Sequence, residues 1–113
     1  MTARLTSAIL VNALVRRADQ SGGSAMVLAK GDATSGAILL LTMEKGGNLR
    51  FFERGLGPDG EPTLIPSGPA TLENDSAATE YWKRRRERDS DLWVVELDIA
   101  QAERFAAETI GLH

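Results

Sequence analysis

The amino-acid sequence predicts a single α+β domain in which a small antiparallel sheet of four to five strands packs against three helices. Two observations indicate this class. Apolar residues recur at helical spacing in three segments, and short apolar or alternating runs separated by glycine-rich turns lie between them. With 113 residues, 42% of them hydrophobic, the chain has enough apolar material for one core but not for two. Residues 1–113 are therefore expected to form one domain.

Three segments have the pattern of an amphipathic helix. The first covers about residues 7–20 and ends before Gly22-Gly23. Its apolar arc is wider than one buried face requires, which indicates either a position inside the core or coverage by a second subunit. The second helix is expected over about residues 74–88, and the third over about residues 100–110.

Strands are predicted between these helices, at about residues 25–30, 37–43, 49–54 and 91–98, with a short edge strand at 63–65. The run Ile38-Leu39-Leu40-Leu41 suits a central strand that is covered on both faces. The connections at 31–36 and 45–48 have the composition of hairpin turns, so the first three strands are expected to form an antiparallel meander. The predicted order is α-β-β-β-(β)-α-β-α.

The residue types that most enzymes and metal sites need are scarce. The chain has no cysteine, which excludes disulfides, thiolate metal sites and thiol catalysis. Its one histidine, His113, is the last residue, where a general base or a metal ligand would not be held in place. Gly55–Gly60 has the glycine spacing of a nucleotide-binding loop, but it contains a proline and no helix follows. We therefore expect no metal and no cofactor, and the sequence favours a non-catalytic role over an enzymatic one.

Charge and hydropathy limit the remaining partners. The net charge is −3 and the isoelectric point is near 5.1, so the molecule as a whole is not a polycation that nucleic acid or acidic lipid would attract. The longest apolar run near the start is broken by Asn12 and is far shorter than the roughly 20 residues of a membrane span. We expect a cytoplasmic protein without a membrane partner.

The most distinctive feature is an arginine-rich segment within the second predicted helix. Its cations are Lys83, Arg84, Arg85, Arg86 and Arg88. Four acids lie between Glu80 and Asp91, so the local net charge is only +1, and the count favours a helix of compensating ion pairs over an anion-binding helix. Arg85 continues the core-facing stripe and is expected to pair with Asp89 or Asp91. The candidate partner-binding residues are therefore Lys83, Arg84, Arg86 and Arg88.

A second, weaker candidate is the segment Lys30-Gly31-Asp32. A glycine turn between opposite charges can hold a polar group of a ligand, and this makes Lys30 and Asp32 candidate binding residues. The simpler interpretation is a hairpin corner with a solvated ion pair, which is worth about 0–1 kcal/mol. The composition favours the corner.

The segment from Tyr81 to Asp98 resembles a small alphaproteobacterial family known as domain of unknown function 1491. The opening residues Ala3 to Ser7 and the stretch Lys30-Gly31-Asp32, followed by Gly36, are similar to the same family. The resemblance implies one short domain over the whole chain and implies no activity. The chain departs from the family at Ser90, where proline is expected, and this loosens the turn.

Three functional hypotheses follow. The favoured one is a non-catalytic interaction domain that forms a homodimer through the first helix or an exposed sheet edge, with another protein as a further possible partner. The second is a nucleic-acid or phosphate-binding domain that uses the arginine-rich helix. The third, with the least support, is an enzyme built on carboxylates and Lys30.

Overall fold

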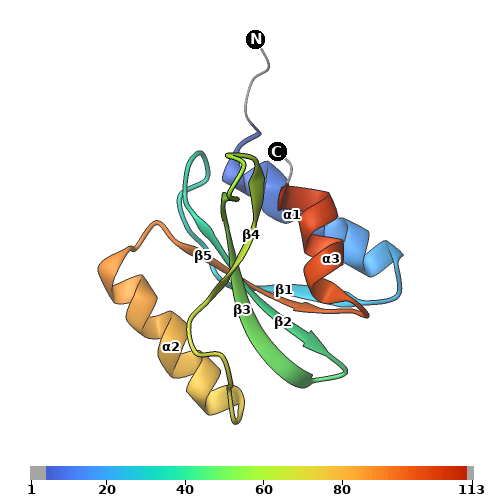
Figure 1. Cartoon of the computed structure of the whole chain (residues 1–113), viewed down its shortest axis with the longest axis vertical. Helices are drawn as coiled ribbons and strands as arrows, with labels where there is room; N and C mark the ends of the chain where they lie inside the picture. The colour runs from blue at the N-terminus through green and yellow to red at the C-terminus, as the bar shows by residue number, and fades with distance from the viewer. Residues whose placement is uncertain (1–4, 112–113) are drawn as a thin grey trace.

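The computed structural model describes residues 5–111, so the prediction for His113 lies outside the described residues. The elements in chain order are α1 (Ser7–Gln20), β1 (Ser24–Ala29), β2 (Ile38–Glu44), β3 (Gly47–Leu56), β4 (Pro62–Ser67), α2 (Asp75–Arg88), β5 (Trp93–Asp98), α3 (Ala102–Ala106) and a π-helical turn η1 (Ala107–Gly111) (Figure 1). The predicted α+β class, with three helices and this order of elements, is confirmed. The predicted edge strand at 63–65 is a strand of six residues.

The five strands form one sheet in the order β1-β5-β2-β3-β4. Strand β5 lies between β1 and β2, antiparallel to β1 and parallel to β2, so the sheet is mixed and not purely antiparallel. The predicted hairpin at 31–36 is therefore wrong, although the hairpin between β2 and β3 forms as predicted. The physical reason is that β5, which is apolar on both faces and covered there by helices, takes an interior place in the sheet and so separates β1 from β2.

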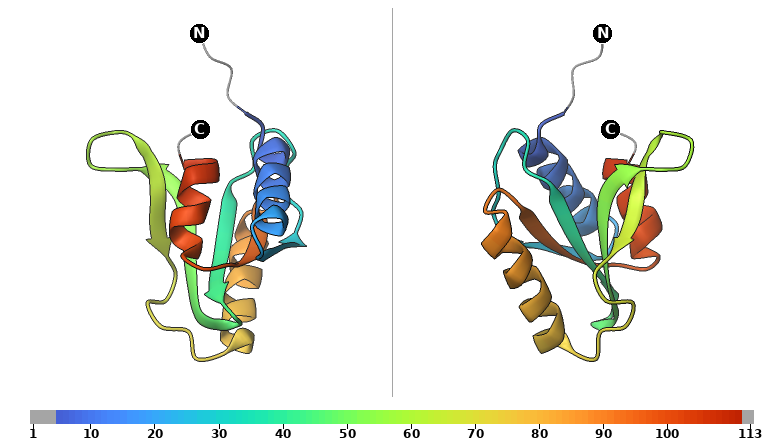
Figure 2. Two further views of the ribbon diagram at one scale, coloured as in Figure 1. Left: turned by 90° about the vertical axis from the view of Figure 1, so that its right-hand side faces the viewer. Right: turned by 60° about the vertical axis from the view of Figure 1, so that its left-hand side comes forward.

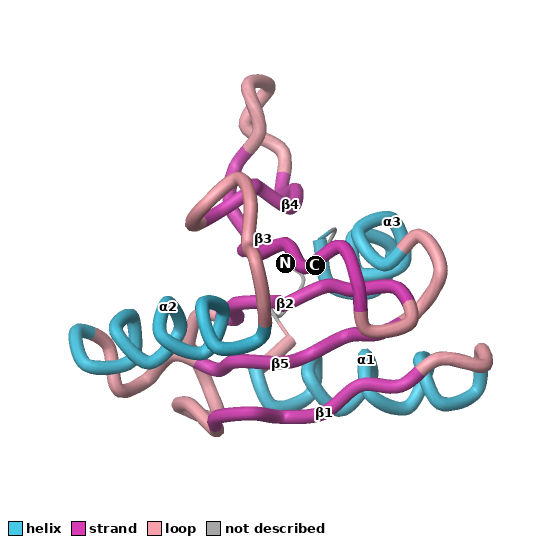
Figure 3. Tube along the Cα trace, turned by 90° about the horizontal axis from the view of Figure 1, so that it is seen from below, coloured by secondary structure: helices cyan, strands magenta, loops and turns pink. Residues whose placement is uncertain are grey.

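The sheet separates two apolar clusters. Helices α1 and α3, with η1, pack on one face, and α2 packs on the other (Figure 2; Figure 3). In β5, Trp93 and Val95 belong to the α1 side and Val94 to the α2 side, as the alternating pattern predicts. Residues 38–41 of β2 are all buried, which confirms its predicted central place.

The connection from β1 to β2 passes against the start of β5 with very close backbone contacts. The Asp32 N–H donates to the Asp91 carbonyl at 3.0 Å, and the Trp93 indole N–H donates to the Asp32 carbonyl at 2.7 Å. A Cβ atom on Gly31 would lie 2.1 Å from the Asp91 carbonyl oxygen, and one on Gly36 would lie 2.2 Å from the same atom. Neither position can therefore hold a side chain unless the loop moves away from the Asp91 carbonyl.

The same connection also holds the start of α1. The first amides of a helix have no partner inside the helix. Here the Ser7 N–H donates to the Thr34 carbonyl at 3.2 Å, and the Ala8 N–H donates to the Ala33 carbonyl at 2.9 Å. The Ser7 hydroxyl is buried and donates to the Gly36 carbonyl at 2.5 Å. One loop thus joins α1 and β5 through main-chain groups.

A hydrogen-bonded cluster fastens α2 to strands β3 and β4. The Arg85 guanidinium lies 2.8 Å from the Glu53 carboxylate, 3.0 Å from the Tyr81 hydroxyl and 3.2 Å from the Ser67 hydroxyl. The Ser67 hydroxyl donates to Glu53 at 2.7 Å. Partial burial alone would raise the pKa of Glu53, but the hydrogen bonds from Arg85 and Ser67 outweigh it and lower that pKa below its usual value.

The prediction that Arg85 pairs with Asp89 or Asp91 is wrong. Arg85 lies one helical turn after Tyr81 and shares its core-facing stripe, so its side chain points at the sheet. Asp89 lies just past the end of α2, where its carboxylate accepts the Asp91 N–H at 3.0 Å. The helix therefore contributes one of its cations to the fold.

We expect the substitution Gly31→Ala to destabilise the fold by about 2–4 kcal/mol, because the new methyl group would collide with the Asp91 carbonyl. Gly47→Ala is the matched control, since a Cβ atom there meets its nearest atom, the Glu44 carbonyl oxygen, at 3.7 Å. It should change stability by less than about 1 kcal/mol. Urea unfolding of the variants measures both effects, and equal stabilities would show that the contact does not limit the fold.

We expect the stabilising effect of Glu53 to depend on pH. The folded-state pKa of Glu53 is depressed, so its stabilisation is complete above the usual pKa of 4.5 and disappears as the pH falls through the lower folded-state value. Glu53→Gln should cost about 1 kcal/mol at pH 7, given the partial solvent exposure of the pair, and less near pH 3. Thermal unfolding at both pH values measures this, and a cost independent of pH would contradict the assignment.

Candidate functional site

The arginine-rich segment lies on the second half of α2, where its side chains have different environments. Lys83, Arg84 and Arg88 are exposed, and the Lys83 ammonium lies 5.9 Å from the centre of the Trp82 ring. Arg86 is half-buried, and its guanidinium donates to the Leu92 carbonyl at 3.1 Å and to the Ser90 carbonyl. Arg86 thus supports the turn that leads from α2 into β5.

Fewer cations of this segment are exposed than the sequence indicates. Arg85 binds Glu53, and Arg86 binds carbonyl groups of its own turn, so two of the five cations contribute to the fold. Lys83, Arg84 and Arg88 remain available to solvent on this helix. Three cations beside exposed Glu80 and Glu87 give a weak local field.

The other candidate pair, Lys30 and Asp32, lies in the connection between β1 and β2. Asp32 is exposed, and its carboxylate accepts the Ser35 N–H at 2.9 Å, the Thr34 N–H at 3.2 Å and the Ser35 hydroxyl at 3.2 Å. The hydrogen bond from the Ser35 amide is the main cause of a lowered pKa of Asp32. The carboxylate thereby organises its own turn, while Lys30 stands exposed just after β1.

The wide apolar arc of α1 is explained in part by α3. Leu10, Val11, Leu14 and Ala18 are buried against the sheet and the final helix. On the flank, the Arg17 guanidinium lies 5.2 Å from the centre of the Phe105 ring and donates to the Thr109 hydroxyl at 2.7 Å. These contacts cover one side of the arc.

Ile9, on the remaining part of this arc, stays 51% exposed.

The structure adds a candidate surface on strand β1, which forms one edge of the sheet. Its sequence, Ser24 to Ala29, has no charge and no proline, and Met26 is 61% exposed and Val27 40% exposed. We name this surface, from Ser24 to Val27, the β1 edge. Sequence reasoning anticipated an exposed edge but did not identify the strand. The absence of charged residues from this run was the available signal.

In the range 5–111, no group of three or more histidine or acidic side chains is arranged to hold a metal ion. Within the same range, none of the helices is both long enough and apolar enough to cross a membrane.

Comparisons with known proteins identify the family. The model of the family described as "Protein of unknown function (DUF1491)" matches residues 5–107, which confirms the resemblance noted in the sequence. The chain is 33% identical to a DUF1491 family protein from Caulobacter crescentus in a crystal structure, with a TM-score of 0.75, covering 90% of this chain and 94% of that one. An NMR structure of a DUF1491 family protein from the same organism gives the same identity and TM-score, with 92% and 94% covered.

A third solved structure, of a protein from A. tumefaciens, is 28% identical, with a TM-score of 0.69 over 86% of this chain and 87% of that one. None of the curated proteins that were compared matches the chain. The family model spans nearly all of the described sequence, and structures at this identity share the whole arrangement of helices and strands. The chain belongs to the DUF1491 family.

Proposed function

We propose that the protein is a non-catalytic interaction domain that associates with a second copy of itself through the β1 edge. The observation that supports this is the difference between the two edges of the sheet. An edge strand presents unpaired N–H and C=O groups, and proteins that remain monomeric usually block such edges with charges or prolines.

The opposite edge, β4, has such protection, whereas β1 does not. Strand β4 contains Pro62 and Pro66, which cannot donate main-chain hydrogen bonds to an added strand. Strand β1 has neither proline nor charge, and its two central side chains are exposed on opposite faces of the sheet. An added strand would therefore meet an uninterrupted run of main-chain donors at β1, whereas the two prolines interrupt that run at β4.

A second copy is the partner that fits this edge. Antiparallel pairing of two β1 strands places apolar residues opposite apolar residues, and no like charges meet within the strands. Lys30 follows one end of β1, and Asp98 pairs with Ser24 at the other end. Both charges lie outside the run from Ser24 to Val27, and the Asp98 carboxylate is occupied by the N–H groups of Lys45 and Gly46, so the contact within the strands is apolar.

The length of the joint follows from the register. The pairing of β1 with β5 is regular from Ser24 to Val27, and it shifts at Leu28, where a β-bulge interrupts it. We therefore expect about four residues of each strand in the new pairing. Ile9 of α1, on the helix that covers the Val27 face of the sheet, supplies further apolar surface.

Two other functions have less support. Exposed Lys83, Arg84 and Arg88 favour phosphate or nucleic-acid binding as the second candidate, in which Arg86 would contribute from the turn. A carboxylate enzyme using Lys30 ranks last, because Asp32 and Asp98 both accept backbone amides of turns. The absence of cysteine agrees with a reducing compartment, and we infer a cytoplasmic location.

We expect Met26→Lys to weaken self-association at least about tenfold, which is about 1.4 kcal/mol, because each joint would bring two added cations close together. The side chain is mostly exposed, so the unfolding temperature should change little. Ile65→Lys, at a 39% exposed position on β4, is the matched control and should leave association unchanged. Analytical ultracentrifugation across protein concentrations measures this. A wild-type monomer at all concentrations, or equal weakening by both variants, would refute the proposal.

The second candidate function predicts binding of single-stranded oligonucleotides that weakens steeply with salt. Three exposed cations give a slope of about −2 in a plot of log affinity against log salt concentration. Arg84→Glu with Arg88→Glu should abolish this binding, while Arg16→Glu, an exposed position on the other side of the sheet, should reduce it little. Fluorescence anisotropy measures the affinity, and no binding at low salt would eliminate this candidate.

A further inference from the structure

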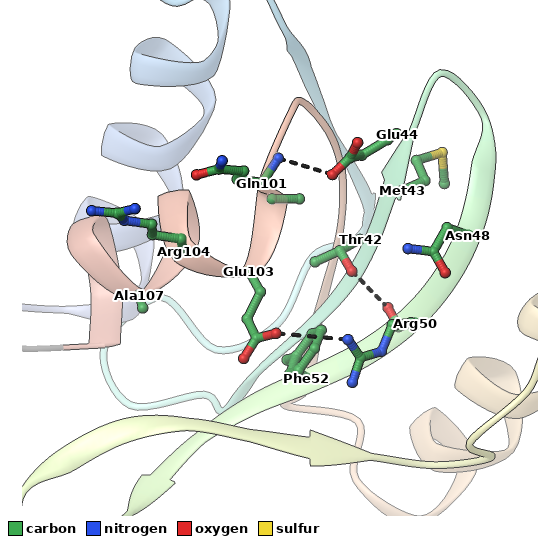
Figure 4. Close-up of a pocket in the computed structure, with 11 residues that line it drawn as sticks. Thr42, Met43, Glu44, Asn48, Arg50, Phe52, Gln101, Glu103, Arg104 and Ala107 are labelled. Atoms are coloured by element: carbon green, nitrogen blue, oxygen red, sulfur yellow. Dashed lines mark hydrogen bonds and ion pairs between the residues drawn. The ribbon is translucent and has the colours of Figure 1, made fainter.

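A cavity of about 340 Å³ lies between the β2–β3 hairpin and the start of α3, away from the β1 edge and the arginine-rich segment. Side chains from three elements converge on it (Figure 4). Thr42 comes from β2, Asn48 and Arg50 come from β3, and Glu103 comes from α3. The size falls within the range of small-molecule sites in proteins.

One cation and one anion face each other across this cavity. The Arg50 guanidinium lies 3.7 Å from the Glu103 carboxylate, which is longer than a hydrogen bond, and the two side chains are 46% and 53% exposed. The contact is therefore loose enough for a bound ligand to replace it. Arg50 also lies 4.8 Å above the centre of the Phe52 ring, and this contact orients its guanidinium.

The neighbouring charges have other contacts. Arg104 also lines the cavity, but its guanidinium pairs with Glu108 at 3.5 Å. The Glu44 carboxylate accepts the Gln101 N–H at 2.9 Å. Arg50 and Glu103 are consequently the charged groups that face each other in the cavity, and together they favour a ligand with one negative and one positive group.

An apolar wall lies beside this pair. Phe52 and Ala102 are buried, and half-buried Ala107 continues the wall along the final helix. The hydroxyl of Thr42, which is also buried, donates a hydrogen bond to the Arg50 carbonyl at 3.3 Å. This bond supports the strand that carries Arg50.

The backbone around the cavity is held in an uncommon conformation. Asn48 and Gln101 both line it with positive φ angles, 55° and 52°. Such conformations persist where neighbouring contacts enforce them, here the hydrogen bond from Gln101 to Glu44. The start of α3 is thus fixed relative to the hairpin before any ligand arrives.

We propose that this cavity binds a zwitterionic α-amino acid with an apolar side chain. The carboxylate of the ligand binds the Arg50 guanidinium, and its ammonium group binds the Glu103 carboxylate. The apolar side chain lies against half-buried Ala107, next to the Phe52 ring that the Arg50 guanidinium covers. This site is independent of the proposed self-association, because neither Arg50 nor Glu103 belongs to β1 or α1.

The test uses L-leucine as the probe, followed by amide chemical shifts in two-dimensional NMR. We expect saturable shifts around Arg50 and Ala102, with a dissociation constant of about 1 mM or lower. Two matched probes each lack one charge: 4-methylpentanoate lacks the ammonium group, and 3-methylbutylamine lacks the carboxylate. Each should bind at least about tenfold more weakly than L-leucine, because one charge of the pair is left without its partner.

The variants Arg50→Gln and Glu103→Gln should each weaken L-leucine binding at least about tenfold, while Arg104→Gln, which removes a cation paired with Glu108, should not. Unchanged unfolding temperatures would show that the variants fold. Three results would overturn the proposal: no saturable shift with L-leucine, equal binding of 4-methylpentanoate, or tighter binding to Glu103→Gln. The last two would indicate a site for simple anions.

Discussion

The position of β5 between β1 and β2 is the constraint on which the rest of the structure depends. Once β5 pairs in parallel with β2, the chain that leaves β1 must pass the start of β5 to reach β2. It does so in contact with the Asp91 carbonyl, where Gly31 and Gly36 leave no room for a side chain. The same loop supplies the carbonyl groups that receive the first amides of α1. Sheet order and the placement of α1 are therefore coupled through a single main-chain contact region.

This sheet order also determines which surfaces are available for binding. Because β5 takes the interior position, β1 is displaced to the edge of the sheet with an uncharged sequence, while proline-containing β4 forms the other edge. The contact between Arg85 and Glu53 holds α2 on the face of the sheet opposite to α1. Because Arg85 makes this contact, it is not available to the basic surface of α2. The unprotected β1 edge and the weakened basic surface are thus consequences of the same packing.

Local patterns predicted the elements well, and long-range pairing accounts for what they missed. The alternation in β5 and the apolar run Ile38–Leu41 identified both buried strands and their faces. No local pattern shows that β5 would pair with β1, about 70 residues earlier in the chain, or that Arg85 would bind Glu53, 32 residues away. The candidate cations were identified from composition. Arg86 supports the turn between α2 and β5 by donating to the Leu92 carbonyl. This role depends on where the helix ends, which composition does not reveal.

The central claim is that β1 is an edge that a second copy completes, and amide hydrogen exchange at increasing protein concentration tests it most directly. Exchange reports whether a backbone N–H is bonded or open to water. The account predicts that amides within Ser24–Val27 that point away from β5 exchange more slowly as the concentration rises, while the amides of β4 do not change. Exchange at β1 that is independent of concentration, or slowing that appears at β4 instead, would contradict it.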